Sequence, residues 1–263
     1  MGSNAMLVDG TLVPVPGVTV IGSHDEEWAH LDPGDYCWRG TIPVTKVMLH
    51  KTIADDPEKL IAGKGPAGGA ERDAKFWQQD PAHSGAQLVS GHDGVLACLC
   101  DVVRCAAYHA TISNMDSIGI ETCELVGGGV YEAALETTVA ATLALVEHLG
   151  VQLQVPSRTY NGHPLKRMLA GERELVGVFG HRDNTEARGR WDPGEELFRR
   201  LRARGAEAFD FDAGEDLAKW RERQTVLVAK GHKLIVDGIP GPATTAALKA
   251  EGYRGGVYAL GKI

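Results

Sequence analysis

The stretch LVGVFGHRDNTEARGRWDPGEELFRRLRARG, Leu175 to Gly205, contains the pattern that decides the fold. It begins with a short apolar run typical of a buried strand and ends with GEELFRRLRARG, which predicts a helix. Between them, His181 and Asp192 lie at the two ends of a loop rich in charge and glycine. Either this loop is a solvated turn, or it folds back so that both side chains bind one ligand.

The segments before this stretch alternate between strand and helix patterns. KVMLH (46–50) and SIGIETCEL (117–125) are apolar strands, and AQLVSGHDGVLACLCDVV (86–103) predicts a hairpin because Asp-Gly is a strong turn signal. From 131 to 149 the apolar residues recur every three or four positions, which predicts an amphipathic helix ending at Gly150.

Strands mixed with helices indicate an α/β domain over residues 41–205. The preceding residues, 1–40, are rich in Gly, Pro and Asp and are interpreted as an extension, in which MGSNAM resembles a remnant of expression cloning before a native start near Met6. A change in composition predicts a linker at 206–214, and residues 215–263 then form a small second domain.

The bulk composition excludes several classes of protein. A formal net charge of −8 leaves no basic surplus for nucleic acid. Five cysteines, an odd number, do not indicate a disulfide framework; Cys98 and Cys100 are interpreted as buried thiols, with a metal-binding Cys-x-Cys as the alternative. No apolar run reaches the about 18 residues of a membrane span, and no signal peptide is visible.

Two histidines, His50 and His181, end predicted strands, and Asp192 follows in the loop after the second. Residues at the ends of neighbouring strands can converge, and two imidazoles plus one carboxylate suit a catalytic zinc ion whose fourth position stays open to water. The spacing alone does not distinguish these histidines from ordinary surface or core histidines, since the chain has ten.

Five motifs place these residues in a wider pattern: VMLHKT, SGAQLVSGHDG, AAYHA, NMDSIGIE and GHRDNTEARGRWDPG. In this order they resemble the zinc-dependent N-acetylmuramoyl-L-alanine amidases of type 2, which share a fold with peptidoglycan recognition proteins, over about residues 44–200. The resemblance implies a mixed central sheet flanked by helices, and it implies that His50, His181 and Asp192 bind Zn²⁺. Pro193 would then suit the first position of the closing helix.

The same resemblance implies roles for five further residues. Glu121 becomes the general base, with a solvated strand-end glutamate as the alternative. Arg190, where many relatives have lysine, would stabilise the oxyanion of a tetrahedral intermediate, and an ordinary surface arginine is the alternative. His109, Thr52 and Asn114 are implied to bind substrate, although His109 could equally be a core histidine bonded to backbone.

KLIVDGIPGPATTAALKA, residues 233–250, resembles a peptidoglycan-binding domain of the three-helix type. Thr244 would cap the helix that follows the Gly-Pro turn. A helical extension that binds no ligand is the alternative.

These observations predict a cell-wall hydrolase that cleaves the amide bond between N-acetylmuramic acid and L-alanine, as phage endolysins do. The alternatives are a peptidoglycan recognition protein without catalysis and a cytoplasmic hydrolase of soluble muropeptides. We expect a monomer whose partner is peptidoglycan, with no nucleic acid and no membrane segment. It would be cytoplasmic until its release to the cell wall, or secreted if a leader has been removed.

Overall fold

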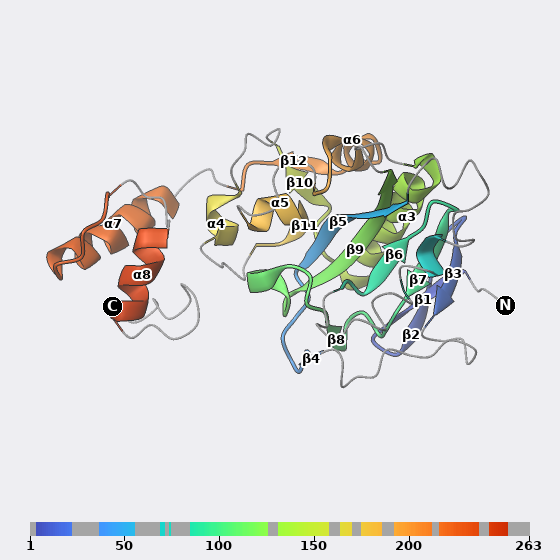
Figure 1. The fold of residues 1–263 in the computed structure, drawn as a ribbon, viewed down its shortest axis with the longest axis horizontal. Helices are drawn as coiled ribbons and strands as arrows, with labels where there is room; N and C mark the ends of the chain where they lie inside the picture. The colour runs from blue at the N-terminus through green and yellow to red at the C-terminus, as the bar shows by residue number, and fades with distance from the viewer. Residues whose placement is uncertain are drawn as a thin grey trace.

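The computed structural model describes residues 4–22, 37–55, 69–71, 74, 85–125, 131–157, 164–169, 175–185, 192–211, 216–236 and 242–251 (Figure 1). The strands are β1 (Ala5–Val8), β2 (Thr11–Pro14), β3 (Thr19–Gly22), β4 (Cys37–Trp38), β5 (Lys46–Asp55), β6 (Leu88–Ser90), β7 (Val95–Cys98), β8 (Cys105–Ala106), β9 (Ser117–Leu125), β10 (Gln154–Pro156), β11 (Gly177–Gly180) and β12 (Glu207–Phe209). The helices are η1 (Thr111–Ser113), α3 (Glu132–Leu149), α4 (Lys166–Leu169), α5 (His181–Asn184), α6 (Glu195–Ala203), α7 (Asp216–Ala229) and α8 (Pro242–Ala250).

A six-stranded sheet in the order β11-β5-β9-β6-β7-β3 forms the centre of the fold (Figure 1). All neighbouring strands are parallel except β6 and β7, which form the antiparallel hairpin that the Asp-Gly pair predicts. The predicted mixed sheet with flanking helices is therefore confirmed. Because β11, β5, β9 and β6 run in one direction, their carboxyl ends lie along one edge of the sheet.

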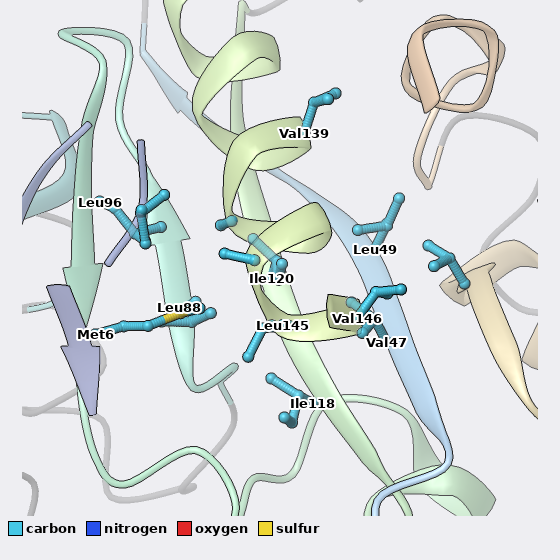
Figure 2. Close-up of a cluster of buried hydrophobic side chains, with 14 of the residues drawn as sticks. Met6, Val47, Leu49, Leu88, Leu96, Ile118, Ile120, Val139, Leu145 and Val146 are labelled. Atoms are coloured by element: carbon cyan, nitrogen blue, oxygen red, sulfur yellow. The ribbon is translucent and has the colours of Figure 1, made fainter. Parts of the chain in front are cut away.

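Helix α3 covers one face of this sheet, and its apolar side packs on β5 and β9. Figure 2 shows Val139, Leu145 and Val146 near strand residues Val47, Leu49, Ile118 and Ile120, all of them buried. The helix ends at Gly150, whose φ of 65° lies in the left-handed region that favours glycine. The helix predicted from the apolar spacing is therefore confirmed.

The opposite face of the sheet carries the alternate residues of the same strands, because side chains in a strand alternate between faces. Met48 and His50 of β5 lie on this face, as do Gly119 and Glu121 of β9. Met48 belongs to a buried apolar cluster with Ala110, Leu165, Met168, Leu175, Phe179 and Phe211. Cys98, Cys100, Cys105 and Cys123 are buried thiols, as expected for thiols that pack as small apolar groups.

The N-terminal segment, which the sequence analysis separates from the α/β domain, contributes to it directly. Strand β3 pairs with β7 at the edge of the sheet, and Met6 is completely buried in the core. Asp101 accepts hydrogen bonds from the backbone N–H groups of Asp9 and Gly10, at 2.9 and 2.7 Å, which attaches the β1–β2 turn to the domain. The strands are too short and too often interrupted by Gly and Pro to give a clear period.

Replacing Met6 with alanine is expected to lower the free energy of unfolding by about 2–5 kcal/mol, because it leaves a cavity in the core. The matched control is Leu12→Ala in the same hairpin, since Leu12 is 52% exposed. The control should change stability by no more than about 0.5 kcal/mol. Urea denaturation of the full chain measures the free energy of unfolding of both variants. If Met6→Ala lowered it as little as Leu12→Ala does, the hairpin would not be part of the cooperative fold.

The domain also extends beyond residue 205, into the segment predicted as a linker. Strand β12 pairs in parallel with β10, and Phe211 packs against Phe179 with ring centroids 4.6 Å apart.

Within the second predicted domain, α7 and α8 are joined by a buried hydrogen bond from Gln224 Nε2 to Thr244 Oγ1, at 3.3 Å. Thr244 lies inside α8 rather than at its cap. In the parts of the chain that the structure describes, no helix is long and apolar enough to cross a membrane.

Candidate metal centre

His50 and His181 are brought together by the pairing of two parallel strands. Gly180, the last residue of β11, lies opposite Leu49 of β5, so the next residue of each strand is a histidine. His181 begins α5 and is buried, and its Nδ1 atom lies 3.0 Å from Nδ1 of His50. The two histidines converge as expected from the sequence, but only β11 ends here, because β5 continues past His50 to Asp55.

Asp192 completes the group by returning to the same edge of the sheet. Its Oδ2 atom lies 3.1 Å from His181 Nδ1, and its Oδ1 atom lies 4.0 Å from His50 Nδ1. The backbone N–H of Lys51 donates to Asp192 Oδ1 at 3.0 Å, and the N–H of Arg182 donates to the Asp192 carbonyl at 2.7 Å. The two ends of the charged loop therefore meet, and both side chains point at one position.

The helix after Asp192 starts later than expected. Helix α6 begins at Glu195 with Gly194 as its N-cap, so Pro193 precedes the helix instead of occupying its first position. The Asp192–Pro193 peptide bond is cis.

The donor set fits a zinc ion. One nitrogen from each histidine and one carboxylate oxygen lie within 4.8 Å of one another, and all three side chains are buried. In a tetrahedral zinc site with bonds of about 2.0–2.1 Å, neighbouring donors lie about 3.3 Å apart. Three protein donors of the N, N, O type leave the fourth position to a small molecule, as catalytic zinc sites do.

Glu121 lies beside this group on the neighbouring strand. It is paired with His50 in the β5–β9 ladder, and its Oε1 atom lies 3.9 Å from His50 Nδ1. Its side chain keeps 13% of its surface exposed, compared with 2% for His50. A carboxylate at the border of the buried group is in a position to exchange protons with a molecule that enters from solvent.

His109 is buried behind His50, and this differs from the expected contact with substrate. Its Nδ1 atom lies 2.9 Å from His50 Nε2, and its Nε2 atom lies 3.2 Å from Ser117 Oγ. Both ring nitrogens therefore have protein partners. Burial, together with the nearby charge of Arg39, lowers the pKa of His109 to about 3, so the ring is neutral at pH 7.

The loop that carries His109 is fixed by two asparagines. Asn114 Oδ1 accepts hydrogen bonds from the N–H groups of His109 and Ala110, at 3.0 and 2.6 Å. Asn184, the last residue of α5, donates to the Ala110 carbonyl and to Thr111 Oγ1. The oxygen of Asn114 thus organises the loop, and its implied contact with substrate stays a prediction.

Two other predicted residues lie wholly or partly outside the described part of the structure. Thr52 follows His50 by two positions in β5, but its side chain lies outside the described part of the structure. Arg190 lies outside the described residues altogether. Their roles stay predictions.

Three residues near the site were not identified from the sequence. Asp183 accepts a hydrogen bond from the N–H of Gly180 at 2.8 Å, and Arg182 forms a 2.9 Å ion pair with Glu195, so α5 holds His181 by several contacts. Ser117 shares a strand face with Glu121, because the two are four positions apart in β9. The period of two in SIGIE was the signal that could have placed Ser117 beside the site.

Comparison with known proteins gives one family and several solved structures. Residues 40–195 match the profile of a protein family described as N-acetylmuramoyl-L-alanine amidase. No curated protein matches the chain. Among solved structures, the chain is similar to Drosophila peptidoglycan recognition protein SA, with 12% identity and a TM-score of 0.45 over 73% of this chain and 95% of that one. It is also similar to the endolysin amidase LysCS from Clostridium intestinale URNW, with 12% identity and a TM-score of 0.39 over 70% and 93%.

Proposed function

The chain belongs to the N-acetylmuramoyl-L-alanine amidase family, and from this membership we propose that it is a zinc-dependent hydrolase of bacterial peptidoglycan. The bond cleaved is the amide between N-acetylmuramic acid and the L-alanine of the stem peptide. The observation that supports this proposal is the buried group of His50, His181 and Asp192. The carboxylate of Glu121, 3.9 Å from His50, favours catalysis over recognition alone.

Each residue has a distinct task in this proposal. His50, His181 and Asp192 bind the metal; when bound, zinc supplies Lewis-acid chemistry that makes water a nucleophile near neutral pH. Glu121 accepts a proton from the attacking water at its carboxylate and returns it to the amine of the leaving L-alanine. Arg190 is proposed to stabilise the negative charge that develops on the carbonyl oxygen.

We also propose that the second domain binds the cell wall. Its weak binding would keep the catalytic domain close to an insoluble substrate and raise the local concentration of cleavable bonds. Such a combination is typical of phage endolysins, which act after release from the cell, and we infer this biological setting by analogy.

The test is digestion of purified sacculi, followed by mass spectrometry of the soluble products. Free stem peptides that begin with L-alanine are expected, lost when zinc is chelated and restored when zinc is added back. Sedimentation of the protein with sacculi without any release of peptide would instead support a recognition protein. Release of reducing sugars or of shortened peptides would show that a different bond is cleaved.

A further inference from the structure

A chain of four polar groups leads from a backbone carbonyl to the candidate metal ligand His50. Ser117 Oγ lies 2.5 Å from the carbonyl oxygen of Ser113, Ser117 Oγ lies 3.2 Å from His109 Nε2, and His109 Nδ1 lies 2.9 Å from His50 Nε2. His50, His109, Ser113 and Ser117 are all buried, so water does not compete for these contacts.

The positions of the protons along this series of hydrogen bonds follow from its first hydrogen bond, between Ser117 and Ser113. A carbonyl oxygen only accepts, so the Ser117 hydroxyl donates its one proton to Ser113. The Ser117 oxygen can then only accept, which requires a proton on His109 Nε2. Burial favours the neutral form of His109, and a neutral ring that is protonated at Nε2 carries its lone pair on Nδ1.

We propose that His109 is a positioning residue that fixes His50 as the Nε2–H tautomer and thereby presents the Nδ1 lone pair of His50 to the metal. This inference rests on the proposed function, since it concerns the zinc site of that function. His50 Nε2 must donate to His109, because His109 Nδ1 can only accept. The Nδ1 atom that remains is the one that faces His181 and Asp192.

The surroundings of His109 are built to accept its ring at this position. Gly119, on the neighbouring strand, has no Cβ, and a Cβ there would lie 2.7 Å from His109 Nδ1 and 2.8 Å from Cγ. The backbone of His109 is held by Asn114 Oδ1. The ring and the backbone of His109 are therefore both constrained, as is required of a residue that orients a metal ligand by a hydrogen bond.

The test compares two substitutions at one position. His109→Phe keeps an aromatic ring but removes the acceptor, whereas His109→Asn keeps an acceptor close to the position of Nδ1. Zinc affinity, measured by competition with a chromophoric chelator, should fall about 10–100-fold in His109→Phe and stay within a few-fold of wild type in His109→Asn. Ser117→Ala should give a smaller loss, because it removes only the partner that orients His109.

Two further measurements separate positioning from a merely structural role. Long-range ¹H–¹⁵N spectra of the zinc-loaded protein should show His50 and His109 both protonated at Nε2. The visible absorption of the cobalt-substituted protein should change in His109→Phe and not in the control His148→Ala, since His148 is exposed at the end of α3.

The outcomes distinguish this inference from the proposed function. Equal zinc affinity in wild type and His109→Phe, or a proton on His109 Nδ1, would overturn the inference alone. Wild-type protein that binds no zinc would overturn both. Tight zinc binding that weakens in His109→Phe, without any cleavage of sacculi by wild type, would support the inference and overturn the proposed function.

Discussion

Replacing Glu121 with glutamine is expected to reduce cleavage of sacculi by about 100–10,000-fold while zinc stays bound, because the substitution removes the only proton acceptor that we assign to the reaction. Glutamine has nearly the same shape as glutamate, so the strand pairing of β9 with β5 should not change. The amide cannot accept a proton from water at neutral pH. The loss should therefore appear in kcat, with little change in the binding of sacculi.

The measurement is the initial rate of stem-peptide release by wild type, Glu121→Gln and the control Glu147→Gln, each with zinc content determined on the same sample. Glu147 lies on the exposed side of α3, and its substitution should leave the rate unchanged. Full activity of zinc-loaded Glu121→Gln would exclude Glu121 as the general base. The same loss in Glu147→Gln would indicate a general effect of charge.

Replacing His181 with alanine is expected to remove both the metal and the activity. The substitution deletes one of three protein donors, so zinc affinity should fall by more than the about 100-fold that changes around a metal ligand produce. Asp192→Asn is the matched variant, since it keeps an oxygen that can accept the hydrogen bond from Lys51 but removes the negative charge. Its affinity for zinc should lie between those of wild type and His181→Ala.

Zinc titration followed by activity at saturating zinc checks this expectation. His148→Ala serves as the control for the loss of a histidine as such. Thermal unfolding of the zinc-free proteins shows whether a variant has lost its fold rather than its metal. Stoichiometric zinc and full activity in His181→Ala would mean that the metal is bound elsewhere.

The parts of the fold that the sequence predicts are those with a strong local pattern. The helix over 131–149 and the hairpin around Asp93-Gly94 follow from the spacing of apolar residues and from turn chemistry, which neighbouring residues determine. Strands β3 and β12 are short, and their backbone partners lie in distant segments, so their pairing depends on the tertiary fold. Local pattern therefore placed the boundaries of the α/β domain too narrowly.

In the candidate site, too, the sequence predicts what local motifs determine and does not predict the contacts that depend on the tertiary fold. Motifs identify His50, His181 and Asp192, because each occurs in a recognisable run of residues. They do not identify which nitrogen of His50 faces His181 and Asp192, since the orientation of that ring involves a contact with His109, which in turn contacts Ser117. The direction of the His109 ring is a property of packing around Gly119, which single-residue patterns do not encode.

The place of β3 in the sheet has a consequence for any attempt to study the α/β domain alone. The family match spans residues 40–195, but β3 lies before it and pairs with β7. A fragment cut to the limits of the match would leave β7 as an open edge with unpaired backbone donors and acceptors. Open edges of this kind join to those of other molecules and lead to aggregation. Strand β3 therefore protects the edge of β7, and a fragment that lacks β3 is expected to associate with other copies through that edge.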